Sequence, residues 1–384
     1  MVAPFEFSTA TRIVFGPGKI RSLPALARPL GERALVVTGA DSTRAVRALA
    51  GLEETGISAT YFSIRGEPSL QTVREGARAA QGSEFVIGFG GGSAMDAAKA
   101  IAALAANSGE PLDYLEVIGE GRPLERAPLP FITIPTTAGT GAEVTRNAVL
   151  GSPDHKVKAS LRSPLLVAKL ALLDPDLTLG TPPFITVSTG LDTLTQLIEP
   201  FVSSRANALT DSFCVAGIER VTEALPRAVR DGQDRAARES MAFASLLSGL
   251  SLANAGLGIV HGFAAPLGGL LNAPHGALCA AVLPHGMAIN IRALRERAST
   301  HPSLDKYRRI ARLLTGSAAA EAEDGVRYVS ELCVRLKVPS LGAYGLPSRG
   351  ISDLVAKVAV TSSAKANPIP LSKSELEEIA ECAL

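Results

Sequence analysis

An aspartate and an amide side chain stand four residues apart in GLDTLTQLIEP, residues 190–200. Four helical residues turn the chain by roughly 400°, so Asp192 and Gln196 would share one face of a helix, one turn apart. Carboxylate oxygens bind divalent metals, and an amide oxygen can also ligate. The spacing is therefore compatible with a metal site, with a metal site that has an altered ligand, or with ordinary helix chemistry.

Two histidines lie farther along the chain in an uncharged region. Residues 240–291 contain no Asp, Glu, Lys or Arg, and this region includes His261 in GIVHGFAAPLGG and His275 in NAPHGALCA. Neutral imidazole is the commonest metal-ligating side chain, so the two histidines and the aspartate suggest a divalent-metal site. Pro266 and Pro274 argue against one helix through both histidines, so folding must bring them together. A buried histidine bonded to the backbone is the ordinary alternative for each.

Glycines follow a strand-like run in FVIGFGGGSAMDAAKA, with Ser93 at the start of a helical segment. Gly91 and Gly92 would allow close approach of a phosphate, which the helix N-terminus also favours. The motif is not a Rossmann fingerprint, because it follows the third strand-like run and lacks the expected acidic residue downstream. A tight turn needs the same glycines without a ligand, so phosphate binding stays open on this motif alone.

Threonines cluster after the next strand-like run. Thr136, Thr137 and Thr140 lie among small residues in IPTTAGTGAEVTRN. Their hydroxyls and backbone amides could line a nucleotide groove at the carboxyl ends of the strands. The alternative is an ordinary threonine-rich cap and loop.

The elements that must position these residues change character within the 384-residue chain. Strand-like runs alternate with helical segments in the first half, which predicts a mainly parallel sheet covered by helices. Long helical patterns follow the proline-rich stretch 175–183, which predicts an all-helical second half. The strand-like runs are 34–40, 60–64, 85–93, 129–137 and 165–175, and the helical runs include 43–52, 69–81, 94–106, 208–229, 303–316 and 325–338.

Composition excludes several classes of protein. Lys and Arg total 38 against 37 for Asp and Glu, so nothing indicates a nucleic-acid or membrane-surface partner. The four cysteines have no CxxC spacing, which argues against a zinc finger and fits a reducing compartment. The first residues lack the pattern of a signal peptide. Prolines, histidines and glycines interrupt the uncharged region, so buried helices around a polar site explain it better than a membrane span does.

Taken together, the motifs resemble those of the iron-containing, metal-dependent alcohol dehydrogenases over nearly the whole chain. The matching segments, in the family's order, are IVFGPG, GFGGGSAMDAAK, IPTTAGTGAEVT, DPDLT, TGLDTLTQLIE, and GIVHGFAAPLGG with PHG. The resemblance implies an α/β dinucleotide-binding domain over residues 1–178 and an all-helical metal- and substrate-binding domain over 179–384, with a cleft between them. It implies an NAD(P)-dependent oxidoreductase that transfers hydride between nicotinamide and a small alcohol or carbonyl substrate. We further expect a cytoplasmic homodimer or higher homo-oligomer.

Carried over by position, the resemblance places both cofactors. The family holds its metal with an aspartate and three histidines, and Gln196 stands where one histidine is usual. We therefore expect a looser site with Gln196 as the fourth ligand, favouring zinc or another divalent ion over iron, or else a lost metal. The expected metal ligands are Asp192, Gln196, His261 and His275. The expected NAD or NADP contacts are Gly39, Asp41, Gly91, Gly92, Ser93, Thr136, Thr137, Thr140, Thr145, Asn147 and Lys158. The substrate-pocket candidates are Arg146, Asn147 and Ala265.

Two further departures from the family bear on the reaction. Ala265 stands where many relatives carry a second histidine near the nicotinamide and the substrate. A proton relay through that histidine is therefore unavailable, and we expect room for a bulkier substrate. Gly39 stands where NAD-preferring relatives often carry an acidic residue, which favours NADP. Asp41, two residues on, could substitute, so NAD stays open.

Three alternatives remain at this stage. A maleylacetate-type reductase of a charged keto acid would need a cationic contact, which Arg146 could supply. A lyase similar to dehydroquinate synthase would need a basic phosphate pocket, which the uncharged region lacks. A nucleotide-binding relative with lapsed metal chemistry would account for Gln196 and Ala265, but the retained aspartate and histidines argue against it.

Overall fold

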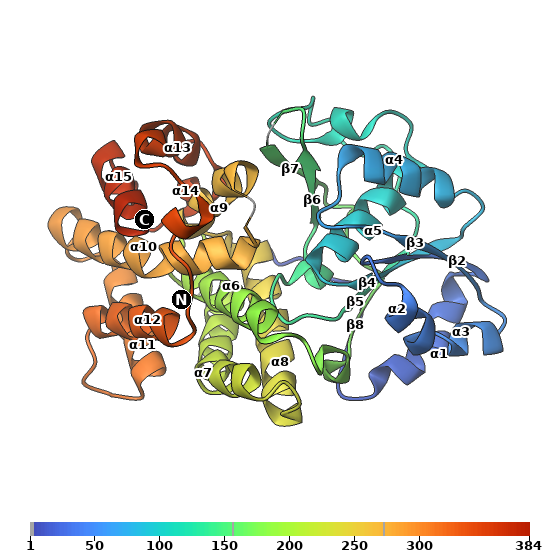
Figure 1. Cartoon of the computed structure of the whole chain (residues 1–384), viewed down its shortest axis with the longest axis horizontal. Coiled ribbons are helices and arrows are strands. Elements are labelled where there is room, and N and C mark those ends of the chain that lie inside the picture. The colour runs from blue at the N-terminus through green and yellow to red at the C-terminus, as the bar shows by residue number, and fades with distance from the viewer. Residues whose placement is uncertain (1–3, 156, 272) are drawn as a thin grey trace. The chain divides into compact units, whose positions relative to one another are not determined.

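The computed structural model describes residues 4–155, 157–271 and 273–384, which form two compact units. The α/β unit spans Ser8–Leu179, and the helical unit contains Gly180–Leu384 together with residues 4–7 (Figure 1). The predicted boundary lay one residue earlier and assigned the N-terminal residues to the first domain. Residues 4–7 group with the helices because the ring of Phe7 packs edge-on against that of Phe213, with centroids 5.9 Å apart.

A six-stranded parallel sheet forms the centre of the α/β unit. Its strand order is β1-β8-β5-β4-β2-β3, and every neighbouring pair is parallel, as predicted. The inner strands are continuously apolar because helices cover both faces of such a sheet. The strands are β1 (Ile13–Phe15), β2 (Arg33–Thr38), β3 (Ser58–Ser63), β4 (Phe85–Gly90), β5 (Phe131–Pro135) and β8 (Leu170–Leu173).

Helices pack on the two faces of this sheet (Figure 1). On one face, Leu23 and Leu52 join a buried cluster with Ile87 of the sheet. The neighbouring Gly88 points to the opposite face, where α5 packs on β4 and β5. A Cβ at Gly88 would lie 2.8 Å from the Cβ of Ala98, so glycine permits the close approach of α5. The helices are α1 (Leu23–Ala27), α2 (Thr43–Ala48) and α3 (Gly51–Glu54) on the first face, and α4 (Leu70–Ala79) and α5 (Gly92–Ala106) on the second.

The strand order reverses at β2. The chain passes from β2 to β3 on one side of it and returns to β4 on the other, so the carboxyl ends of β2 and β4 form a topological switch point. Open α/β sheets bind their ligands at such a point. Gly39 directly follows β2, the glycine turn follows β4, and the threonine loop follows β5. The fold therefore gathers the predicted nucleotide-binding segments at one edge of the sheet.

The structure contains a small antiparallel hairpin that the sequence analysis did not predict. Strand β6 (Asn147–Ser152) pairs with β7 (Val157–Arg162), and β6 contacts α5 and α4. The inward residues of β6 include Ala148 and Leu150, which alternate with less buried ones. This alternation covers few residues, and Lys158 and Arg162 interrupt the apolar residues of the second strand, so the pattern was too weak to predict the pair.

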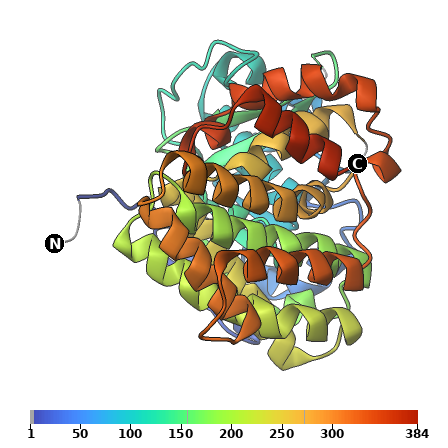
Figure 2. The same cartoon turned by 90° about the vertical axis from the view of Figure 1, so that its left-hand side faces the viewer.

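Long helices packed side by side form the second unit (Figure 2). The predicted helical runs there correspond to α7, α11 and α12, and α7 continues through Pro226. The helices are α6 (Pro183–Val202), α7 (Ala208–Arg230), α8 (Arg235–Ala255), α9 (Ile259–Leu270), α10 (His275–Arg297), α11 (Pro302–Thr315), α12 (Ala322–Arg335), α13 (Ile351–Ala359), α14 (Ser362–Ala366) and α15 (Lys373–Cys382).

The uncharged region supplies interior helices. Within the residues that the structure describes, α10 alone is long and apolar enough to cross a bilayer, and 78% of its apolar window is buried among other helices. Helices α8 and α9 pass the same test only as a pair, and they bend by 98° where they meet. Burial of this extent is typical of a core helix, in agreement with the sequence interpretation.

Replacing Gly88 by alanine should destabilise the α/β unit. The added methyl group meets Ala98 at 2.8 Å and the Cα of Met95 at 3.3 Å, and overpacking of this kind costs about 1–3 kcal/mol. Gly39→Ala is the matched control, because a Cβ there meets nothing within 4 Å. Urea unfolding of both variants measures the difference. Equal unfolding midpoints for the two variants would contradict the close approach of α5.

Candidate active site

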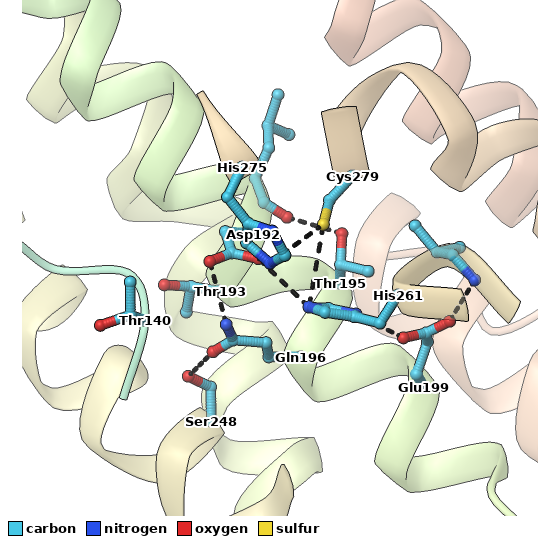
Figure 3. A network of polar contacts seen from close by, with 12 residues as sticks. Thr140, Asp192, Thr193, Thr195, Gln196, Glu199, Ser248, His261, His275 and Cys279 are labelled. Atoms are coloured by element: carbon cyan, nitrogen blue, oxygen red, sulfur yellow. Dashed lines mark hydrogen bonds and ion pairs between the residues drawn. The ribbon is translucent and has the colours of Figure 1, made fainter. Parts of the chain in front are cut away.

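Three predicted metal ligands converge within the helical unit (Figure 3). Asp192 projects from the middle of α6, His261 from the first turn of α9, and His275 is the first residue of α10. The Oδ1 atom of Asp192 lies 3.4 Å from Nε2 of His261 and 3.8 Å from Nε2 of His275. The two imidazole rings are tilted, with centroids 5.4 Å apart. The predicted convergence of distant residues is therefore present in the fold.

Local sequence explains how α10 reaches α6. Pro274 is the N-cap residue of α10, so the two histidines lie on separate helices. Gly276 follows, and a Cβ there would lie 2.1 Å from the carbonyl oxygen of Ser188 and 2.9 Å from the Cβ of Asp192. Only glycine fits at this contact, and the close approach that it permits places His275 beside Asp192.

Asp192 carries the observation that points to a cation. Its side chain is 2% exposed, and Oδ2 accepts a hydrogen bond from Nε2 of Gln196 at 2.9 Å. Oδ1 has no hydrogen-bond partner among the described residues, although it faces both histidines. A buried carboxylate oxygen is costly unless a cation or donor compensates it. A divalent metal between these side chains would supply that partner, so the residues fit the metal that the family resemblance implies.

Gln196 has a different arrangement from the predicted one. Its Nε2 faces Asp192, and its Oε1 accepts a hydrogen bond from the hydroxyl of Ser248 at 2.9 Å. A carboxylate oxygen can only accept, so the amide must turn its NH₂ group toward Asp192. Gln196 therefore orients the aspartate, and its oxygen points away from the cluster.

Cys279 completes the cluster instead. Its Sγ lies 3.8 Å from Nε2 of His261 and 3.7 Å from Nε2 of His275, and the ligand atoms of all four residues lie within 4.8 Å of one another. Cys279 is fully buried. The sequence analysis missed it because it considered only CxxC spacing. The available signal was the separation of four residues from His275, which places both side chains on one face of a helix.

Glu199 holds His261 from the other side of the ring. Its Oε2 lies 2.6 Å from Nδ1 of His261, and its Oε1 accepts the backbone N–H of Val260 at 2.6 Å. A proton on Nδ1 leaves Nε2, which faces the cluster, free to ligate. Sequence reasoning also missed this residue, although Glu199 stands seven residues after Asp192, two helical turns along the same face.

Charges inside the cluster shift the titration of its members. Burial opposes charge on His261, but Cys279, Glu199 and Asp192 outweigh burial and raise its pKa. Cys279 raises the pKa of His275. Burial opposes ionisation of Cys279, but the two imidazoles outweigh it and lower the pKa of the thiol.

The cofactor segments of the α/β unit contact one another. A Cβ on Gly92 would lie 2.7 Å from Cγ2 of Thr140, and one on Gly91 would lie 3.5 Å from the hydroxyl of Thr137. Gly91 is the N-cap of α5 and offers no side-chain cap, so the helix begins uncapped beside the threonines. Ser93, in the first turn of α5, is half-buried. Thr136, which directly follows β5, is half-buried too. This arrangement suits an anionic group such as a phosphate.

Three of the predicted cofactor contacts also have protein partners. The hydroxyl of Thr145 accepts a hydrogen bond from Nζ of Lys99 at 2.8 Å, and the carbonyl of Asn147 accepts another from the same ammonium at 3.0 Å. Lys158 forms an ion pair with Glu67 at 2.7 Å. Thr145 thus supports the loop from inside, and the ammonium of Lys158 is already paired.

The remaining candidates lie in open or half-buried positions. Asp41 is exposed, and its Oδ1 accepts the backbone N–H of Thr43 at 2.8 Å, so hydrogen bonds to Thr43 lower its pKa. Gly39 and Arg146 are half-buried, and Ala265 is exposed on α9 one turn after His261. Nothing within 4 Å would meet a Cβ at Gly39.

Two buried ionisable groups belong to this region, Lys99 of α5 and Glu143 of the threonine loop. Burial lowers the pKa of Lys99 to about 8 and raises the pKa of Glu143 to about 7. Lys99 forms its ion pair with Asp96, with 3.9 Å between Nζ and Oδ1. Its hydrogen bonds to Thr145 and to the carbonyl of Asn147 anchor the loop to α5.

A parallel sheet with a glycine turn at its switch point, and a helical unit with metal donors, together define a metal-dependent, nucleotide-linked dehydrogenase. The chain matches the family described as iron-containing alcohol dehydrogenase over residues 10–175, and its C-terminal part over residues 186–384. The chain belongs to this family, as its motifs predicted.

Individual relatives agree with this assignment. Long-chain-alcohol dehydrogenase 1 of Geobacillus thermodenitrificans is 36% identical, covering 86% of this chain and 84% of that protein. Alcohol dehydrogenase 4 of Saccharomyces cerevisiae is 34% identical, covering 91% and 90%. The crystal structure of a 1,3-propanediol oxidoreductase matches with a TM-score of 0.92 and 29% identity over 100% of both chains. This chain is thus an oxidoreductase that acts on CH–OH groups of small molecules with NAD(P) and a divalent metal.

Glu199→Gln should weaken metal binding about 10- to 100-fold, because carboxylates that orient ligating histidines contribute affinity of that order. The amide keeps the size of the side chain but loses the charge that fixes the proton on Nδ1 of His261. Competition with a chromophoric chelator measures the affinity for zinc. Glu219→Gln, at an exposed position on α7, is the control and should bind zinc as the unmodified protein does. Equal zinc affinity in both variants would show that Glu199 does not contribute to metal binding.

Proposed function

We propose that this enzyme interconverts alcohols with aldehydes or ketones by NAD(P)-linked hydride transfer at a divalent metal held by Asp192, His261 and His275. The observation that carries the proposal is the buried Oδ1 of Asp192, which faces two imidazole nitrogens and has no hydrogen-bond partner among the described residues. When bound, the metal supplies Lewis acidity toward the alcohol or carbonyl oxygen, and the nicotinamide donates or accepts the hydride.

The protein's own residues fix the geometry of the metal donors. Gln196 orients Asp192 from one side, and Glu199 orients His261 from the other. The uncharged helices of residues 240–291 surround the donors with a medium of low polarity, which strengthens electrostatic interactions inside the site. We assign no general acid or base, because the position one turn after His261 holds alanine.

Several features support finer assignments of the cofactor, the substrate and the compartment. The open space at Gly39 and the engagement of Asp41 with Thr43 support NADP as the preferred cofactor, with NAD also accepted. The exposed methyl group of Ala265 supports a bulkier substrate, and one relative is a long-chain-alcohol dehydrogenase. We also propose a cytoplasmic homodimer or higher homo-oligomer, and the four free cysteines support a reducing compartment.

Removal of metal with a chelator should abolish NADPH- and NADH-linked reduction of an aldehyde panel, and a divalent metal should restore it.

Asp192→Asn should lower kcat/KM on the order of 100-fold or more while cofactor binding persists, because Lewis-acid stabilisation amounts to several kcal/mol. Asp353→Asn, at an exposed site on α13, serves as the control. Activity that survives both the chelator and Asp192→Asn would overturn the metal-dependent mechanism. A charged keto acid in the panel tests the maleylacetate-type alternative.

Gly39→Asp should shift the cofactor preference toward NADH by about tenfold or more in the ratio of kcat/KM values. A carboxylate at the end of β2 can accept a hydrogen bond from the ribose hydroxyl and repels a 2′-phosphate. The backbone and the surrounding space accommodate the side chain. Steady-state kinetics with both cofactors measure the ratio, and Asp41→Asn is the matched variant. An unchanged ratio of kcat/KM values for NADH and NADPH in Gly39→Asp would show that the cofactor's ribose does not bind beside the end of β2.

A further inference from the structure

We propose that Cys279 is a thiolate ligand of the metal, so that the centre is an aspartate, two histidines and a cysteine and is suited to zinc. Gln196 then acts only as a positioning residue for Asp192. This inference rests on the proposed function for the presence of a metal, and it adds the identity of the fourth donor and the class of metal.

The distances between the donor atoms agree with a zinc ion held by four protein ligands, and zinc can expand to five-coordinate when a substrate oxygen binds. Typical bond lengths of about 2.0–2.1 Å for Zn–N and 2.3 Å for Zn–S place neighbouring donor atoms of a tetrahedron about 3.3–3.6 Å apart. The sulfur of Cys279 lies 3.8 and 3.7 Å from the facing nitrogens of His261 and His275. Oδ1 of Asp192 lies 3.4 and 3.8 Å from the same nitrogens. Four of the six donor-to-donor distances therefore lie within about 0.5 Å of the required values, and all six are at most 4.8 Å.

Helix geometry favours the thiol as a donor. His275 and Cys279 stand one turn apart at the start of α10, so both side chains lie on the same face of the helix. Paired ligands at this spacing are a common way for a helix to hold zinc. The three other cysteines of the helical unit lack this setting. Cys214 is buried in α7, the sulfur of Cys333 contacts the carbonyl of Ala280 at 3.5 Å, and Cys382 is exposed at the end of α15.

Gln196 is a poor competitor for the fourth position. For its oxygen to face the metal, the amide would have to rotate, which breaks its buried hydrogen bond to Asp192. The contact with Ser248 would persist, because that hydroxyl can accept a hydrogen bond from the turned NH₂ group while it donates to the carbonyl of Ser245. Rotation would also bring the amide oxygen toward the carboxylate, and neither oxygen can donate a hydrogen bond.

A thiolate changes the preferred metal. Sulfur ligands select zinc and other softer ions, whereas oxygen-rich sites suit harder ones. Binding displaces the proton of the Cys279 thiol to solvent, so the sulfur contributes a negative charge to the cation. The half-exposed side chain of His275, 38% accessible, leaves one side of the cluster open to solvent for loading.

Cobalt substitution of the full-length protein tests the proposal independently of activity. Metal-free protein titrated with Co²⁺ should develop a near-ultraviolet thiolate-to-cobalt charge-transfer band. Cys279→Ser should lose the band and bind zinc at least about 10-fold more weakly. Gln196→Ala should keep the band, with affinity reduced at most about 100-fold, as for other residues that orient a ligand. Cys214→Ser is the matched control and should keep both the band and the affinity. A band that persists in Cys279→Ser, or cobalt binding without a band in the unmodified protein, overturns the proposal.

X-ray absorption of the unmodified zinc protein gives a second measurement that does not depend on any variant folding. We expect one sulfur at about 2.3 Å together with nitrogen and oxygen neighbours at about 2.0–2.1 Å. A zinc shell without sulfur overturns the assignment of Cys279 even if the enzyme is active. A shell with sulfur in a protein that reduces no carbonyl upholds the assignment and contradicts the proposed function instead.

Discussion

The buried carboxylate of Asp192 is the constraint around which the metal site is arranged. Its Oδ1 accepts no hydrogen bond from the described residues and faces the nitrogens of His261 and His275, and a buried charge is costly unless a cation compensates it. Helices α9 and α10 bring nitrogen and sulfur atoms within reach of this oxygen, and Gly276 removes the side chain that would keep α10 from α6. We expect a bound cation to stabilise this arrangement, because the donors are brought together only in the folded protein.

The surroundings of the donors explain how the family's site tolerates glutamine at position 196. The amide is held between Asp192 and Ser248, where it fixes the carboxylate. Glu199 orients His261 in a similar way, because its carboxylate bonds both the ring of His261 and the backbone N–H of Val260. We infer that the sulfur of Cys279 on α10, one turn from His275, supplies the fourth donor in place of the side chain at position 196.

Much of the architecture followed from local patterns. Buried parallel strands are continuously apolar, so β2, β4 and β5 were recognisable from their composition, and amphipathic spacing identified α7, α11 and α12. The short β6–β7 pair was missed because its alternation covers few residues. In the site, Asp192, His261 and His275 were found because each residue type ligates metals and each motif resembles that of a known family.

The amino-acid sequence by itself determined the donors, the uncharged region around two of them, and the glycine and threonine segments that follow β4 and β5. Only the tertiary structure decided which atoms face one another. Gln196 was expected to ligate because it occupies a ligand's position, but its orientation depends on Asp192 and on Ser248, which is 52 residues away. Cys279 and Glu199 acquired their roles in the same way. Hydrogen-bond partners and ligand contacts are set by packing between helices, and that packing is not encoded in the spacing of any one segment.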